Sequence, residues 1–167
     1  MDRVAPERLW IGGLKALDSP ETLEEARITH ILSVLEFDYC DYGEFGKYER
    51  LLIQVEDDPR ESLLRHFSQT SSFIEQALSS GGSVFVHCAM GVSRSAAVTC
   101  AYLMSKRGLS SRKALEQVRQ NRPSCQPNDG FMEQLEVYHR MLEAPNQVES
   151  NMIYSNWMQK QTRPAKM

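Results

Sequence analysis

The chain has 167 residues, of which 41% are hydrophobic and 25% charged, and its net charge is −3 at neutral pH. This length and apolar content predict one domain with a real core, and the net acidity argues against nucleic acid as the main partner. The first residues lack signal-peptide character and no apolar run approaches membrane length, so we expect neither export nor a membrane partner.

The first half of the chain predicts alternating strands and helices. Ser19 and Pro20 have the order of a helix cap and first turn, whereas runs of β-branched and aliphatic residues between turn signals indicate buried strands. The predicted elements are a strand at 9–11, a helix from 20 to about 27, a strand at 29–35, a loop at 36–48 and a strand at 50–55.

The second half predicts mainly helices around one more strand. A helical pattern covers residues 63–78, and the strand Val84–Val86 follows it. The next helix begins near Arg94, is almost wholly apolar and ends at Gly108. A further helix, capped by Ser111, runs to about 121, and the last starts near 128 and ends before 145. The alternation predicts a single α/β domain with a central, mostly parallel sheet flanked by helices.

The loop between Val86 and the apolar helix carries the chemistry. A strand-to-helix loop gathers backbone N–H groups around one small space, which suits a phosphate or another anion. Cys88 at the mouth of the loop lies in the same positive field, which favours thiolate over thiol. Arg94 can hold two oxygens of a tetrahedral oxyanion, and Gly91 permits a tight turn.

The four cysteines (Cys40, Cys88, Cys100 and Cys125) show no C-x-x-C spacing. A structural zinc site or a disulfide framework is therefore not expected. A nucleophilic cysteine needs reducing surroundings, so the cytoplasm, the nucleus or both are the expected locations.

The run His87–Ser95, His-Cys-x-x-Gly-x-x-Arg-Ser, resembles the phosphate loop of the cysteine-dependent protein phosphatases, in particular the dual-specificity branch. The resemblance extends from about Arg8 to Leu142. It implies hydrolysis of phosphotyrosine and phosphoserine or phosphothreonine in proteins through a cysteinyl-phosphate intermediate. The implied reaction needs no metal and no cofactor, and the implied partners are phosphoproteins.

The same resemblance assigns roles within the loop. Cys88 is expected to be the nucleophile and Arg94 the clamp of the transition state. Ser95 resembles the hydroxyl that assists the departing thiolate, the alternative being an ordinary serine at a helix start. His87 is expected to orient the loop rather than to transfer protons. The backbone amides that bind phosphate are those of Ala89, Met90, Gly91, Val92, Ser93 and Arg94.

Two further family features lie outside the loop. Asp57, in Asp57-Asp58-Pro59, matches the general acid, and Asp58 is the neighbour to exclude. Asn128 is expected to brace the phosphate loop through its side-chain amide, the alternative being a simple helix cap. Met90 departs from the usual alanine, and its side chain is expected on the floor of the pocket or behind it.

The chain divides into a catalytic domain at 1–144 and a tail at 145–167, which is either a short docked helix or a segment covered by another region. Met152, Ile153 and Trp157 are expected to pack on the domain, because they would otherwise lie in water. The tail resembles that of the subgroup with a C-terminal zinc-binding domain, which this chain is expected to lack. That subgroup's association with ribosome maturation suggests ribosome-assembly partners and an alternative function, a binding or assembly factor whose catalytic site is incidental. Loss of turnover in Cys88→Ser would favour the enzyme.

Overall fold

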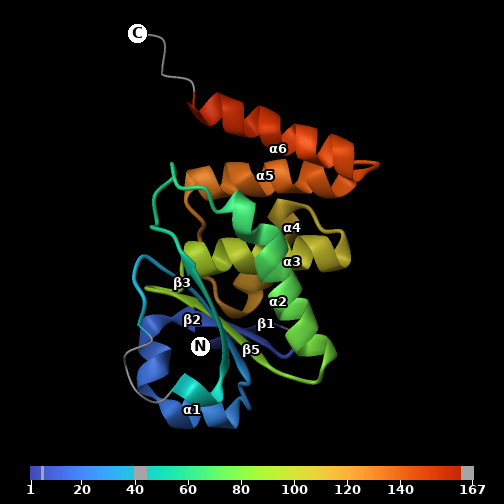
Figure 1. The fold of residues 1–167 in the computed structure, drawn as a ribbon. Helices are drawn as coiled ribbons and strands as arrows, with labels where there is room; N and C mark the ends of the chain where they lie inside the picture. The colour runs from blue at the N-terminus through green and yellow to red at the C-terminus, as the bar shows by residue number, and fades with distance from the viewer. Residues whose placement is uncertain (5, 40–44, 163–167) are drawn as a thin grey trace.

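A five-stranded sheet forms the base of the molecule in the computed structural model, which describes residues 1–4, 6–39 and 45–162 (Figure 1). Its strand order is β1-β2-β5-β3-β4. The strands are β1 (Asp2–Val4), β2 (Leu9–Gly13), β3 (His30–Leu35), β4 (Glu49–Gln54) and β5 (Val84–Cys88). All neighbouring pairs are parallel except β1 with β2. The predicted fold class is confirmed. Strand β1 was not predicted, since it is short and starts with two charged residues.

The described residues also form six α-helices and short 3₁₀ turns at Leu14–Asp18, Phe45–Lys47 and Leu64–His66. The helices are α1 (Pro20–Glu25), α2 (Phe67–Ser79), α3 (Arg94–Arg107), α4 (Ser111–Asn121), α5 (Asp129–Glu143) and α6 (Gln147–Thr162). Two helix starts differ from prediction. The pattern at 63–78 begins as a 3₁₀ turn. Ser110 rather than Ser111 caps α4, because the Ser110 hydroxyl accepts the N–H of Lys113.

The side-chain alternation of the strands divides the core into two clusters, one on each face of the sheet. Val84 and Val86 pack in the larger cluster with α2, α3 and α5, whereas Phe85 packs in a smaller cluster with residues of α1 and the turn before it. Because successive strand residues point to opposite faces, Cys88 joins the larger cluster and His87 faces the other side. Cys88, the candidate nucleophile, and His87 therefore point to opposite faces of the sheet.

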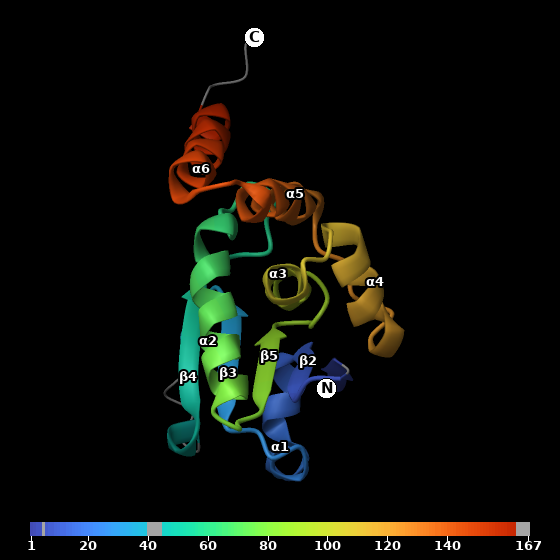
Figure 2. The same cartoon turned by 90° about the vertical axis from the view of Figure 1, so that its right-hand side faces the viewer.

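Helix α3 lies centrally among the helices above the sheet, with α2 on one side of it and α4 on the other (Figure 2). Every residue from Arg94 to Met104 is buried, as the nearly continuous apolar run predicted. The helix ends at Gly108, whose φ of 65° is the left-handed conformation that glycine adopts most easily. A fully buried helix gives the loop before it a fixed end.

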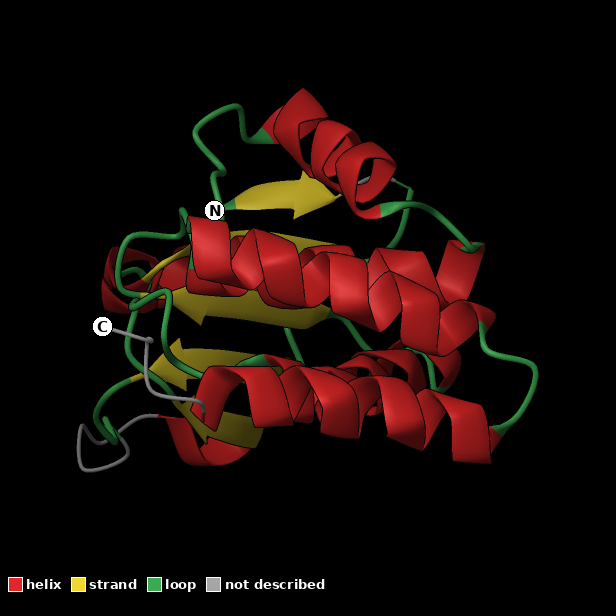
Figure 3. Ribbon diagram, turned by 90° about the horizontal axis from the view of Figure 1, so that it is seen from above, coloured by secondary structure: helices red, strands yellow, loops and turns green. Residues whose placement is uncertain are grey.

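Helix α6 packs on α5 on the side away from the sheet (Figure 1), and the view from above shows the two helices side by side (Figure 3). Trp157 is buried and Ile153 packs against the core, as predicted. The prediction for Met152 is wrong, since its side chain is 58% exposed. Residues four apart share a helix face and adjacent residues do not, so the face with Ile153 and Trp157 excludes Met152. The division of the chain after residue 144 stays a prediction. Within the described residues, no helix is long and apolar enough to cross a membrane.

Truncating Trp157 should destabilise the protein more than truncating Met152. Trp157→Ala removes a buried ring that packs beside Tyr154, and the expected loss in the free energy of unfolding is about 3 kcal/mol. Met152→Ala should change it by less than about 0.5 kcal/mol. Urea unfolding of the two variants measures the difference. Equal stabilities would mean that α6 does not stay on α5 in solution.

Candidate active site

The loop between β5 and α3 turns its carbonyl oxygens away from the Cys88 sulfur. The N–H of Leu14 donates to Ala89 O at 3.0 Å, and the N–H of Gln126 donates to Val92 O at 2.7 Å. Between them, Arg122 donates from Nη2 to the carbonyl of residue 90 at 3.2 Å and from Nε to that of residue 91 at 2.8 Å. In a planar trans peptide the N–H points opposite to the C=O, so the amides of residues 90–93 face the other side. They form an anion-binding concavity.

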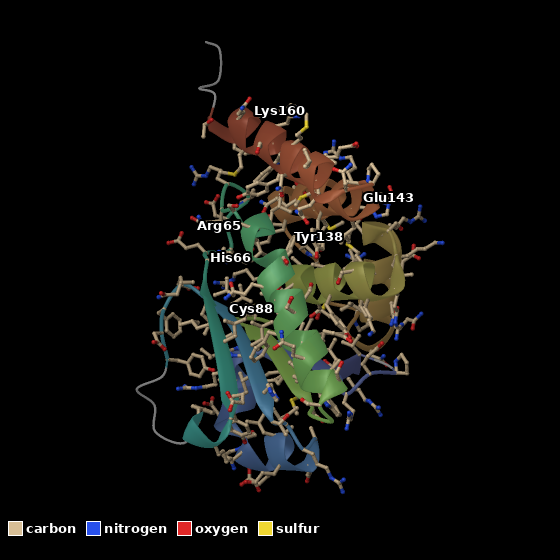
Figure 4. The ribbon with its side chains drawn as sticks, turned by 45° about the vertical axis from the view of Figure 1, so that its right-hand side comes forward. Arg65, His66, Cys88, Tyr138, Glu143 and Lys160 are labelled. Carbon is tan, nitrogen blue, oxygen red and sulfur yellow. The ribbon has the colours of Figure 1, made fainter. Side chains whose placement is uncertain are left out.

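The Cys88 sulfur contacts one of those amides and one side chain of α3. The N–H of Gly91 donates to Cys88 Sγ at 3.2 Å, and Ser95 Oγ lies 3.2 Å from the same sulfur. Both contacts can donate to a thiolate, and the start of α3 adds its positive end. Ser95 is therefore placed to stabilise sulfur as a leaving group, in addition to starting the helix. Figure 4 shows Cys88 on the sheet side of the helical layer and Lys160 of α6 on the outer side.

Arg94 is buried at the first position of α3 with its guanidinium beside the ends of two strands. Its Nη1 donates to Val55 O at 3.0 Å and to the carboxylate of Glu36. Its Nε is buried and has no hydrogen-bond partner among the described residues. A free N–H edge on a fixed guanidinium is a ready donor for a bound oxyanion.

Asp57 and Asp58 differ in their partners. Asp57 Oδ1 accepts a hydrogen bond from Asn128 Nδ2 at 2.9 Å. Asp58 is held by Arg60, which donates from its backbone N–H and Nε to one oxygen and from Nη2 to the other. The Arg60 side chain lowers the pKa of Asp58 to about 2. Both carboxylate oxygens of Asp58 are occupied by Arg60, which also makes this carboxyl harder to protonate, whereas Asp57 contacts Asn128 beside the phosphate loop. This arrangement favours Asp57 as the acid.

Asn128 contacts the loop by a different group from the one predicted. Its backbone N–H donates to Ser93 Oγ at 2.9 Å, whereas its side-chain amide donates to Asp57. Its Oδ1 caps α5 by accepting the N–H of Phe131 at 2.9 Å. The predicted brace through the side-chain amide is wrong, because the cap turns that amide towards Asp57. Asn128 thus joins the segment 57–59, here called the acid loop, to the phosphate loop.

His87 lies beside the phosphate loop in a buried chain of hydrogen-bonded polar side chains. Its Nε2 is 2.6 Å from Ser33 Oγ, and its Nδ1 is 3.2 Å from Cys88 O. The Ser33 hydroxyl also donates to Tyr39 Oη at 2.8 Å. Burial lowers the pKa of His87 to about 4, so the ring is neutral at pH 7. The geometry agrees with a residue that orients the loop.

The buried His87 predicts a loss of stability in acid. The unfolded chain binds a proton at this site near pH 6.5, whereas the folded protein does so only near pH 4. Stability therefore falls as the pH decreases through this window, by about 3 kcal/mol in total. Urea unfolding from pH 7 to 4 measures this loss of stability, and the loss should be smaller by about 3 kcal/mol in His87→Gln. Parallel curves for parent and variant would contradict the assignment.

Met90 does not lie where it was predicted. Its side chain is 74% exposed and points to solvent, so it occupies neither the floor of the pocket nor the space behind it. The reason is the orientation of its peptide, whose carbonyl is tied to Arg122. The longer side chain therefore leaves the packing behind the loop unchanged.

Four residues without a role predicted from the sequence support the site. Arg122 binds the loop carbonyls and also forms an ion pair with Asp2 of β1 at 2.6 Å. Gly130 packs so closely on the acid loop that a Cβ would lie 2.0 Å from Pro59 O. Gln134 is buried and accepts two backbone N–H groups just before α2. Glu36 is the fourth. Its only sequence signal was its place directly after a strand parallel to β5.

The family and two relatives were identified from the sequence. A family model described as "Dual specificity phosphatase, catalytic domain" matches residues 9–141. Dual specificity protein phosphatase 1B of Arabidopsis thaliana is 38% identical over 135 residues, which cover 81% of this chain and 80% of the relative. Dual specificity phosphatase 28 of Homo sapiens is 42% identical over 142 residues, which cover 85% and 79%.

Two crystal structures of phosphatases have a fold similar to that of this chain. The crystal structure of human DUSP28 has a TM-score of 0.79 at 39% identity and covers 86% of this chain and 95% of its own. The crystal structure of the Yvh1 phosphatase domain from Chaetomium thermophilum has a TM-score of 0.78 at 34% identity and covers 87% and 98%. The chain therefore belongs to the dual-specificity phosphatases of the cysteine-dependent protein tyrosine phosphatase superfamily, and it is a protein phosphatase of that class.

Proposed function

We propose that the chain hydrolyses phosphate monoesters on protein side chains in two displacements at Cys88. The thiolate attacks phosphorus, the bond from phosphorus to the ester oxygen breaks, and Asp57 gives its proton to the leaving oxygen. Water then attacks the cysteinyl phosphate, and Asp57 takes a proton from it. The P–S bond breaks and returns the thiolate. Phosphate is released, and the protein ends unchanged.

One observation carries this proposal: the N–H of Gly91 donates to the Cys88 sulfur, and the carbonyls of residues 89–92 in the same loop are held by hydrogen bonds to other segments. Charge builds on the equatorial phosphoryl oxygens as phosphorus passes from oxygen to sulfur. The amides of residues 90–93 and the Nε edge of Arg94 are preorganised donors for these oxygens. Ser95 stabilises the sulfur when it leaves again.

The substrates proposed are phosphotyrosine and phosphoserine or phosphothreonine in proteins, as the family membership supports in general terms. No metal ion or cofactor has a role in this scheme. A reducing compartment, the cytoplasm or the nucleus, fits a mechanism that depends on a free thiolate. Ribosome-assembly partners stay a prediction from the resemblance of the tail.

The test is to trap the intermediate. The parent protein is mixed with an aryl phosphate, quenched in acid within the first turnover and digested for mass spectrometry. Phosphate should appear on the peptide that contains Cys88. Cys100, which is buried in α3, serves as the internal control and should carry none. Turnover without phosphate on the Cys88 peptide, or with phosphate on another residue, would refute the mechanism.

A further inference from the structure

Glu36 follows the last residue of β3 and reaches the one arginine of the phosphate loop. Its carboxylate forms an ion pair with Nη1 of Arg94, although the Arg94 side chain is only 6% exposed and that of Glu36 is 45% exposed. The hydrogen bond from Arg94 also lowers the pKa of Glu36. Glu36 therefore presents a charged carboxylate to a buried guanidinium at neutral pH.

The nitrogens of the Arg94 guanidinium differ in their hydrogen-bond partners. Nη1 serves two acceptors, the Glu36 carboxylate and Val55 O, while the buried Nε has no partner among the described residues. The guanidinium is a rigid plane, so acceptors fixed at Nη1 also fix the direction of the Nε–H bond. A buried N–H without a partner is costly, and a bound oxyanion would satisfy it.

We propose that Glu36 is a positioning residue for phosphoryl transfer, which holds Nη1 with Val55 O so that the Nε edge of Arg94 faces the phosphoryl oxygens. The inference rests on the proposed role of Arg94. In this role Glu36 acts only through Arg94, its ion-pair partner. Glu36 is expected to raise the rate of phosphoryl transfer, because an arginine that is already oriented loses less conformational freedom when the transition state forms. The opposite role is that Glu36 competes with phosphate for Arg94 and slows the enzyme.

Glu36→Ala, Glu36→Gln and a charge-matched control distinguish these roles. Removing the contact in Glu36→Ala should lower kcat on para-nitrophenyl phosphate by about tenfold and weaken competitive inhibition by inorganic phosphate. Glu36→Gln keeps an oxygen that accepts from Nη1, so its kcat should stay within about threefold of the parent. Glu49→Ala removes the same charge from the opposite end of the parallel strands and should leave kcat unchanged.

Two results would overturn the inference. The first is a Glu36→Ala variant that keeps or raises kcat and binds inorganic phosphate more tightly, as expected of a competitor. The second is a folded Glu36→Gln variant as slow as Glu36→Ala, since the amide retains the acceptor. Melting curves confirm that each variant is folded. Failure of the proposed function gives a different result, because the acid-quenched parent would then carry no phosphate on the Cys88 peptide, whatever the rates of the Glu36 variants.

Discussion

Replacing Asp57 by asparagine should slow the hydrolysis of a phosphoserine peptide by about 10²–10⁴-fold. An alkoxide is a very basic leaving group, so the proton from Asp57 is needed as the ester bond breaks. Asparagine has the same shape and still offers an oxygen to Asn128 Nδ2, so the loop should keep its position. A para-nitrophenolate leaves without much help, and the loss on that substrate should be smaller.

Asp58→Asn is the matched control, because it changes the neighbouring residue in the same way. Arg60 pairs with the Asp58 carboxylate and lowers its pKa to about 2, so Asp58 is a poorer proton carrier than an unpaired aspartate. Its loss should change kcat/KM by less than about threefold on either substrate. Rates of both variants are compared on esters of increasing leaving-group pKa. A steep dependence in Asp58→Asn and a flat one in Asp57→Asn would place the acid one residue later.

The phosphate loop could be predicted from the sequence because its function depends on local geometry. A strand, a five-residue loop and a helix start bring Cys88, the loop amides and Arg94 together within seven positions. The alternation of strands and helices likewise predicted the parallel sheet. Asp57 needed the family resemblance, and its distinction from Asp58 needed the structure, because Arg60 pairs with only one of two adjacent carboxyls.

The supporting contacts could not be predicted, since they join residues far apart in the chain. Arg122 binds loop carbonyls 31 and 32 positions earlier, and Glu36 reaches Arg94 over 58 positions. A contact with a main-chain carbonyl does not depend on the side chain of that residue, so the sequence pattern does not indicate it. Met90 was placed wrongly for a related reason, because the direction of a loop side chain follows from peptide orientation rather than from any repeat. Met152 was an avoidable error, since helical spacing already sets it apart from Ile153 and Trp157.

Gly91→Ala should reduce activity at least about 100-fold, although no reacting group is changed. Gly91 has a φ of 68°, and a Cβ there would lie 2.4 Å from the backbone carbon of Gly12 at the end of β2. Neither backbone can yield easily, because the N–H of Leu14 is bonded to Ala89 O and Arg122 holds Gly91 O. The loop must therefore move away from β2, and the amide that contacts Cys88 Sγ moves with it.

Gly108→Ala separates displacement of the loop from backbone strain. Gly108 has a φ of 65°, but a Cβ added there meets no atom within 4 Å, and the residue lies at the far end of α3. Both variants should lose about 1–2 kcal/mol of stability from the left-handed conformation, and Gly91→Ala should lose more from the clash. Only Gly91→Ala should lose kcat and the ability to form the cysteinyl phosphate. If folded Gly91→Ala turns over as fast as Gly108→Ala, the close approach of β2 does not set the shape of the phosphate loop.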